Sequence, residues 1–289
     1  ITQRKNIKLD SLLPQLLNLP DAMALLNAGT IYFLKGNKAS ALTCFEKALV
    51  LCPQNKKILK SISFCLAEQK NPSRAAEYAK TLASLTEEAS DWGRARYYFS
   101  QACDWEKESS IDPAMSNYPF FDIARNISEK ENFESANRFI KHTLNPKLQG
   151  SSSQSVDWKP ESDQVNLAYL CGEFREHATL KLLISVLEFH NTKLFNVFYL
   201  DNGPPDRSRY RQRLEKTDGS FISIFNMSDD EVIALTKGLR IDILINLNGF
   251  FGRERNNVFF KRAAPIQISF LGYPGTMGHP NIDFILADE

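Results

Sequence analysis

Short apolar runs alternate with amphipathic segments in the carboxyl-terminal half of the chain. Runs rich in large or β-branched apolar residues and bounded by turn formers are typical of buried strands, and they occur at 165–170, 194–200, 221–225, 241–249, 265–271 and 283–287. Helices are predicted between them at 179–190, 206–216 and 228–237. The last of these begins with Ser228-Asp-Asp-Glu231, the pattern of a capping box. Because alternating strands and helices favour a parallel sheet with right-handed crossovers, we expect an α/β Rossmann-like lobe.

The amino-terminal half carries a helical pattern that repeats. Seven positions have the spacing of a tetratricopeptide repeat: Ala28, Gly29, Tyr32, Ala41, Phe45, Ala48 and Pro53. Small residues would let two helices approach, and Pro53 would end the second helix because it has no backbone N–H. A degraded copy follows at Ser63, Leu66, Ala75, Ala79 and Leu82, and further helices are predicted around 92–105 and in 123–144. Such an array either offers a concave surface to proteins or acts as a spacer or dimerisation element.

A low-complexity segment separates the two halves. Residues 149–157 read Gln-Gly-Ser-Ser-Ser-Gln-Ser-Val-Asp, a composition that cannot bury apolar surface and is typical of flexible linkers. We therefore predict a TPR-like helical repeat domain at 1–148, a linker at 149–163 and a Rossmann-like lobe at 164–289.

Composition narrows the classes of partner. The 35 basic and 34 acidic residues give a formal charge of +1, which lacks the basic footprint of a nucleic-acid-binding protein. No apolar run approaches the length of a membrane span, and the first residues lack the apolar core of a signal peptide. The five cysteines match no zinc-binding spacing, so we interpret them as reduced packing residues of a cytoplasmic protein. We expect neither nucleic acid nor a membrane as a partner.

Residues with candidate chemistry stand where predicted strands end, at the edge where open α/β sheets bind ligands. His177 follows the first strand and could hydrogen-bond a hydroxyl or exchange a proton, or it could simply cap the next helix or face water. Gly249, together with Asn246 and Asn248, closes the strand at 241–249 and could shape a cleft or merely end the strand. The loop after residue 270 could cradle a sugar or phosphate with backbone N–H groups, or be a tight connection: Leu271, Gly272, Tyr273, Pro274, Gly275 and Thr276.

Other polar residues receive a structural interpretation. His279 is predicted to lie at the surface, and the arginines at 207, 209, 211 and 213 are predicted to form a solvated helix face. Neither a dinucleotide-binding glycine fingerprint nor a Walker A lysine follows the first strand. The lobe therefore shows no sign of a nicotinamide or nucleoside-triphosphate site.

Three segments resemble the O-linked N-acetylglucosamine (O-GlcNAc) transferase family. They are Leu167-Ala-Tyr-Leu-Cys-Gly-Glu-Phe-Arg-Glu-His-Ala-Thr179, Asp242-Ile-Leu-Ile-Asn-Leu-Asn-Gly249, and Arg262-Ala-Ala-Pro-Ile-Gln-Ile-Ser-Phe-Leu-Gly-Tyr-Pro-Gly-Thr-Met-Gly278 with Asp283. Tetratricopeptide repeats ahead of such a lobe add independent support. The resemblance implies a GT-B fold, in which two Rossmann-like lobes enclose the active site. It further implies inverting transfer from a UDP-sugar, with UDP-GlcNAc the first expectation, to Ser or Thr of proteins. No cofactor or obligatory metal is implied.

The resemblance also implies roles for particular residues. His177 matches the family's active-site histidine, and Leu271, Gly272 and Pro274 match the loop that lines the sugar pocket. Two positions depart from the family pattern: Ala178 stands where proline is common, and Lys237 falls about where some members have a second active-site histidine.

The lobe that provides most UDP contacts in the family would follow Glu289, so this chain is expected to be the acceptor-side half. Two interpretations fit, a fragment of a longer enzyme or a half-enzyme that needs a second chain. The alternatives are a non-catalytic repeat-containing protein-binding module, a related enzyme that transfers glucose to protein Asn, and an unrelated nucleotide-sugar enzyme such as an epimerase.

Overall fold

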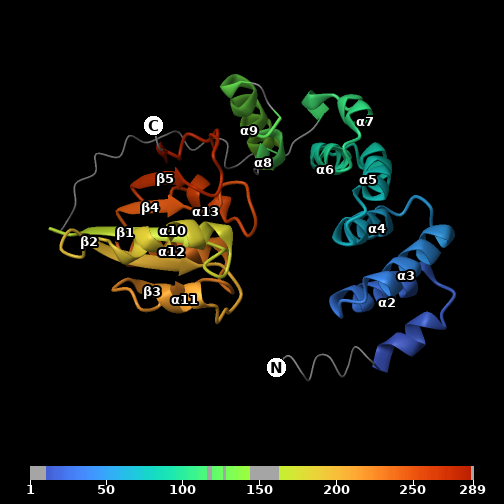
Figure 1. Ribbon diagram of the computed structural model, residues 1–289, viewed down its shortest axis with the longest axis horizontal. Helices are drawn as coiled ribbons and strands as arrows, with labels where there is room; N and C mark the ends of the chain where they lie inside the picture. Colours follow the sequence, from blue (N-terminus) through green and yellow to red (C-terminus); the bar gives the residue numbers. More distant parts are fainter. Residues whose placement is uncertain (1–10, 116–118, 126–127, 144–162, 288–289) are drawn as a thin grey trace. The chain divides into compact units, whose positions relative to one another are not determined.

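The computed structural model describes residues 11–115, 119–125, 128–143 and 163–287 (Figure 1). The chain divides into two compact units, Ile1–Phe121 and Asp122–Glu289. The predicted linker at 149–163 lies outside the described residues except for its last position, so its bounds stay a prediction. In the described ranges no helix has both the length and the apolar character needed to cross a membrane.

The first unit is a stack of helices that pack against their neighbours in sequence. It contains α2 (Ala22–Leu34), α3 (Lys38–Leu51), α4 (Lys56–Glu68), α5 (Pro72–Thr86), α6 (Ala89–Gln101), α7 (Trp105–Ser109) and the 3-10 helix η1 (Pro113–Met115). Side-chain oxygens of Asn37, Asn55 and Asn71 accept hydrogen bonds from backbone N–H groups in the first turns of α3, α4 and α5. These caps explain why each helix begins directly after its turn.

The predicted repeat packing is confirmed. A Cβ atom placed on Gly29 would lie 2.5 Å from the Phe45 ring, so only glycine allows α2 and α3 to approach as they do. In the second copy, Ala75 is fully buried and its carbonyl oxygen accepts a hydrogen bond of 3.1 Å from the Ser63 hydroxyl. The two pairs share one core, which includes Phe45 and Leu66.

The second unit is built on a six-stranded parallel sheet, which confirms the predicted α/β lobe. Its strands are β1 (Val165–Cys171), β2 (Phe195–Asp201), β3 (Ser220–Ser223), β4 (Ile243–Asn246), β5 (Ile266–Phe270) and β6 (Phe284–Leu286). The strand order is β3-β2-β1-β4-β5-β6, and all neighbours pair in parallel. The order reverses between β1 and β4, the point where such sheets open a crevice at their carboxyl edge.

Helices cover both faces of this sheet. On one face, α10 (Ala178–Glu188) and α11 (Arg209–Leu214) share a core with Leu167, Tyr169 and Cys171 of β1. On the other, α12 (Asp229–Gly238) and α13 (Asn256–Phe260) share a core with Ala168 and Leu170 of the same strand. Because residues 167–171 of β1 are buried between the two helical layers, this part of the strand is apolar without a break. The predicted capping box at the start of α12 is confirmed.

Two helices differ from the sequence-based prediction. Residues 123–144 were grouped with the repeats, but α9 (Glu129–Thr143) belongs to the second unit, to which the end of the short α8 (Pro119–Asp122) also contributes. The ring centroids of Phe139 and Phe250 are 4.9 Å apart, and a Cβ on Gly278 would lie 3.1 Å from that of Ala136. An amphipathic pattern predicts a helix but not the surface it packs on. Helix α13 was not predicted, because five residues are too few to show a helical period.

Candidate functional site

The loops after β1 and β4 leave the sheet at the point where the strand order reverses, and Asn248 joins them. Its side-chain oxygen accepts a hydrogen bond of 2.8 Å from the Gly172 N–H, and its amide nitrogen donates to the Phe251 carbonyl oxygen at 3.1 Å. Asn248 is fully buried. A buried polar side chain that satisfies backbone groups on two loops holds both in place, so Asn248 braces the edge of the site instead of facing a ligand.

A second asparagine shapes the same loop. The side-chain oxygen of Asn246 accepts hydrogen bonds from the N–H groups of Asn248 at 3.0 Å and Gly249 at 2.9 Å. Gly249 has a φ of +56°, and a Cβ atom there would lie 2.3 Å from the Cβ of Tyr273. The position therefore requires glycine both for its backbone conformation and for the close approach of the loop after β5.

His177 is the N-cap residue of α10. Its Nδ1 atom accepts a hydrogen bond of 3.3 Å from the Thr179 N–H, and its ring is stacked on that of Phe251, with centroids 5.6 Å apart. The side chain is partly exposed. Since Nδ1 is occupied as an acceptor, the proton of a neutral His177 ring is placed on Nε2. The capping role considered from sequence is thus present, and it leaves Nε2–H as a donor for another group.

The glycine-rich loop packs closely within the lobe. A Cβ on Gly272 would lie 1.9 Å from the Leu247 carbonyl oxygen, and one on Gly275 would lie 2.6 Å from Ile123. Tyr273 is buried, and burial raises the pKa of its phenol. Leu271 is partly buried with a φ of +67°. The two side chains of the loop that are exposed belong to Pro274 and Thr276.

The predicted site residues fall into two groups around the loop after β4. His177 contacts this loop through Phe251, and Tyr273 contacts it through Gly249. Gly275 and Thr276 lie farther along and help to line a groove of about 480 Å³, whose other walls include Phe133 and β6. Phe251 was not singled out from sequence, because a lone aromatic residue in a loop carries no pattern.

Two structural interpretations made from sequence are wrong. His279 was predicted at the surface but is 8% exposed, stacks on Phe260, and accepts a hydrogen bond from the Asn281 N–H through Nδ1 at 3.1 Å. Burial, with a smaller effect of Arg262, lowers the pKa of His279 to about 4.

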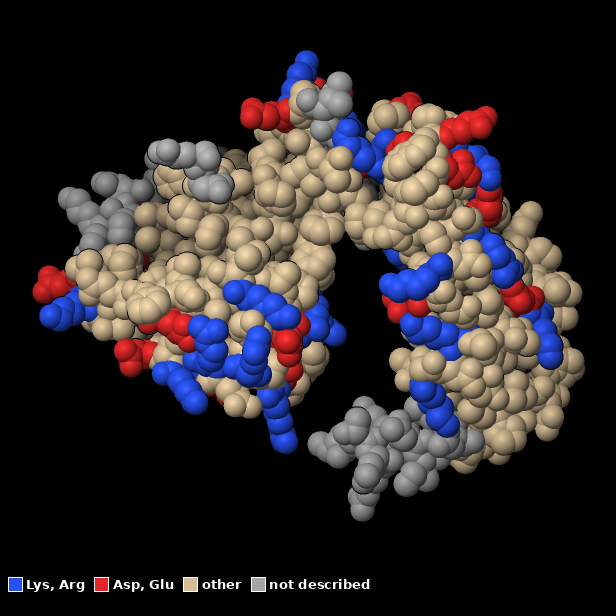
Figure 2. Space-filling model, viewed as in Figure 1, with Lys and Arg blue, Asp and Glu red and all other residues tan. Residues whose placement is uncertain are grey.

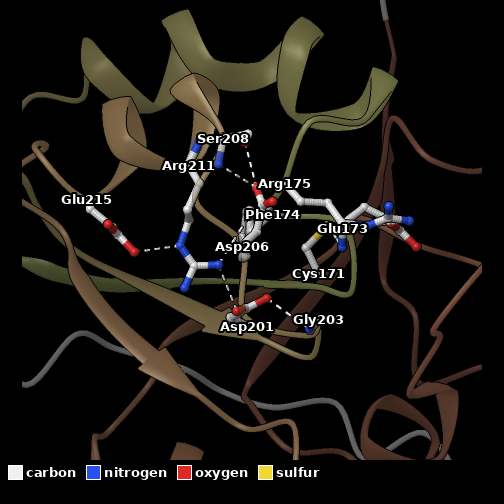
Figure 3. A network of polar contacts seen from close by, with 10 residues as sticks. All are labelled: Cys171, Glu173, Phe174, Arg175, Asp201, Gly203, Asp206, Ser208, Arg211 and Glu215. Atoms are coloured by element: carbon white, nitrogen blue, oxygen red, sulfur yellow. Dashed lines mark hydrogen bonds and ion pairs between the residues drawn. The ribbon is translucent and has the colours of Figure 1, made fainter. Parts of the chain in front are cut away.

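Arg211 was predicted on a solvated helix face but is 7% exposed and is paired with Asp201 (Figure 3). The signal that could have identified it is Leu214, which lies three residues on and shares the buried side of α11.

The surface charges of the two units are mixed in sign. In the view of Figure 2, Lys and Arg side chains lie among Asp and Glu side chains on each unit.

Near the site, Arg175 pairs with the buried Glu173, with nitrogen and oxygen 2.5 Å apart. Arg253 is exposed, and its guanidinium carbon lies 5.2 Å from the ring centroid of Phe225.

Comparison with known proteins gives two matches to family models. Residues 142–289 match Glycosyl transferase family 41, and residues 22–55 match the tetratricopeptide repeat. The first match spans about half of the chain and contains the whole of the described sheet.

Curated relatives resemble the carboxyl-terminal half of the chain. A protein of Arabidopsis thaliana named probable UDP-N-acetylglucosamine–peptide N-acetylglucosaminyltransferase SEC is 34% identical over 126 residues, which are 44% of this chain and 13% of that protein. A UDP-N-acetylglucosamine–peptide N-acetylglucosaminyltransferase of Caenorhabditis elegans is 32% identical over 129 residues, 43% of this chain and 11% of that protein. The chain thus spans a small part of the relatives it matches.

A solved structure shares the fold over most of the chain. An O-GlcNAc transferase mutant from Thermobaculum terrenum superimposes with a TM-score of 0.64 at 18% identity. The match covers 93% of this chain and 54% of that one. Helical repeats followed by a parallel α/β lobe are therefore an arrangement already seen in a solved structure.

Proposed function

Because the chain belongs to glycosyl transferase family 41, we propose that it forms the acceptor-side half of a protein glycosyltransferase. The proposed donor is UDP-GlcNAc, and the proposed acceptors are Ser or Thr hydroxyls of proteins. The family match over residues 142–289 carries the proposal. The names of the plant and nematode relatives support the donor and the peptide acceptor. The proposal assigns no cofactor or metal, since the UDP-sugar is a substrate.

The carboxyl edge of the sheet supplies one wall of the proposed active site. The loops after β1, β4 and β5 meet there, and Asn248 and Gly249 fix their spacing. In a GT-B arrangement the opposite wall, with most contacts to UDP, belongs to a second lobe, supplied by the same polypeptide or by another chain. The charge that develops on the departing diphosphate would be stabilised from that side.

We assign His177 the role of a hydrogen-bond donor in this reaction. The acceptor oxygen attacks the anomeric carbon in line, the bond from that carbon to the diphosphate oxygen breaks, and the hydroxyl proton passes to an oxygen of the departing diphosphate. With Nδ1 occupied by the Thr179 N–H, a neutral His177 presents Nε2–H and cannot take that proton at Nε2. It can instead donate a hydrogen bond to the acceptor hydroxyl or to an oxygen of the sugar donor. Such a bond would hold the reacting atoms in the orientation that the transfer needs.

The helical repeats are proposed to bind acceptor proteins. Repeat arrays bind extended partners because stacked helices create a continuous surface, and the tetratricopeptide-repeat match at residues 22–55 supports this role. The unit would select protein acceptors, while the α/β lobe would contribute to the chemistry.

Transfer of radiolabelled GlcNAc from UDP-GlcNAc to protein by the complete protein tests the proposal. His177→Ala should abolish most transfer, and His177→Asn separates the cap from the imidazole, because asparagine is a good N-cap residue. We expect His177→Asn to keep the melting temperature and to lose activity. Full activity in the asparagine variant would remove the imidazole from the mechanism. Transfer of glucose to asparagine instead would favour the related asparagine-modifying enzymes, and no transfer of either sugar would favour a binding module.

Calorimetry on the 289-residue chain tests where the donor is recognised. We expect UDP and UDP-GlcNAc to bind weakly or not at all, because the proposed diphosphate contacts lie in the other lobe. Micromolar binding to this chain would contradict the assignment of the diphosphate contacts to the other lobe. It would leave glycosyl transfer itself possible.

A further inference from the structure

We propose that Arg211 is a positioning residue that holds the turn between β1 and α10, and with it His177, in its working orientation. This inference rests on the proposed function, in which His177 faces the substrates. Arg211 lies on α11, outside the three loops that form the proposed wall. It acts through the backbone of the turn, and at 7% exposure its side chain is itself buried.

The Arg211 guanidinium connects three elements (Figure 3). Its Nη1 atom donates to Asp201 Oδ2 at 2.9 Å and to the Phe174 carbonyl oxygen at 3.2 Å, while Nε donates to Glu215 at 2.7 Å. The guanidinium carbon lies 3.7 Å from the centroid of the Phe221 ring. One buried side chain thus ties the end of β2 and the ring of a β3 residue to the turn before His177. The planar fork of arginine can make these contacts together, which a lysine cannot.

The contact with Phe174 places this effect close to His177. Phe174 lies in the turn at residues 172–177, three positions before the histidine, and its side chain is 1% exposed. The turn then tightens through hydrogen bonds from the Arg175 N–H to the Glu173 carbonyl oxygen at 2.8 Å and from the His177 N–H to the Arg175 carbonyl oxygen at 2.7 Å. A shift at Phe174 would therefore be transmitted to His177 over a short, hydrogen-bonded stretch.

Asn248 holds the start of the turn through Gly172. The turn is therefore fixed from the β4 side by Asn248 and from the α11 side by Arg211.

The partner of Arg211 complicates a simple deletion. Asp201 is 2% exposed, and burial raises the pKa of its carboxyl group while the Gly203 N–H and Arg211 oppose that change. Removing Arg211 alone would leave a buried carboxylate without its cation and would destabilise the lobe. The double variant Asp201→Asn/Arg211→Gln removes the charge pair together and leaves the turn without its clamp. Arg213→Gln on the same helix is the matched control, because Arg213 pairs at the surface with Glu188.

Hydrogen exchange on the 289-residue chain tests the clamp, and kinetics on the complete protein test its use in catalysis. In the double variant we expect the Arg175 and His177 amides to exchange about tenfold faster at unchanged exchange in the β1 core. We expect kcat to fall by about 10- to 100-fold with a change in donor KM of less than about twofold, because misplacement of a reacting group affects orientation more than binding. Arg213→Gln should match the wild type in both measurements.

Each arm can overturn the inference separately. Unchanged amide exchange in the turn would show that Arg211 is an ordinary structural ion pair. Faster exchange with an unchanged kcat would show that the clamp exists but that the reaction does not depend on it. A wild-type protein that transfers no sugar would refute the proposed function and the catalytic use of the clamp with it, whereas the exchange experiment would still decide whether Arg211 holds the turn.

Discussion

Gly272 packs against backbone, so its replacement should destabilise the lobe before it affects any ligand. A Cβ atom at this position would lie 1.9 Å from the Leu247 carbonyl oxygen and 2.9 Å from the Leu247 carbonyl carbon. The first distance is more than about 1 Å too short for a tolerated contact. Because both neighbours are backbone, relief requires the loop after β5 to separate from the loop after β4. Overpacking of this kind costs about 1–3 kcal/mol, and a backbone clash belongs at the upper end of that range.

We therefore expect Gly272→Ala to destabilise the second unit by about 3 kcal/mol, which lowers its melting temperature by about 6–12 °C. Thermal unfolding followed by circular dichroism measures this. Gly238→Ala is the control, because a Cβ there would meet nothing within 4 Å and its position at the end of α12 favours alanine. A melting temperature for Gly272→Ala within 2 °C of wild type would refute the packing argument and would restore a direct role for this glycine in ligand binding.

Three further predictions follow from single groups. For His279, the folded pKa of about 4 lies below the ordinary value of 6.5, so the unfolded state takes up the proton first as pH falls. The contribution of this group to the free energy of unfolding should be full above pH 6.5 and decline by about 3 kcal/mol towards pH 4. Urea unfolding measures this slope, which His279→Gln should lack. Asn248→Ala leaves the buried Gly172 N–H without its acceptor and should lower the free energy of unfolding in urea by about 1–3 kcal/mol. Asn257 is exposed, so Asn257→Ala should change it by less than about 0.5 kcal/mol. Equal effects of the two substitutions would contradict the bracing role of Asn248. Gly29→Ala should destabilise the first unit by about 1–3 kcal/mol, because the added methyl group would clash with the Phe45 ring. The melting temperature of the second unit should not change. A shift in the second unit would show that the two units do not unfold independently.

Local patterns in the sequence determined the elements and their class. Apolar runs ended by turn formers predicted all six strands. In β1, β2 and β4 the reason is burial on both faces, which favours apolar residues at successive positions and is visible without neighbours, whereas the three residues of the edge strand β6 are exposed. Small and aromatic residues at repeat spacing predicted α2 and α3 because the residue types follow from the distance between two helices that are adjacent in sequence. The position of His177 directly after a strand and before a helix likewise placed it at the carboxyl edge of the sheet.

The tertiary structure alone decided which side chains meet. The sequence could not show that Arg211 is buried, because that depends on Asp201 and Phe174, which arrive from other elements. It could not show that α9 packs on the α/β lobe, since an apolar helix face fits more than one surface. For the glycines after β5 the sequence left a ligand cradle and a tight connection open, and in the folded chain their nearest neighbours are Leu247, Ile123 and Ala136. A glycine pattern records that something comes close to the backbone, and only the folded chain identifies what it is.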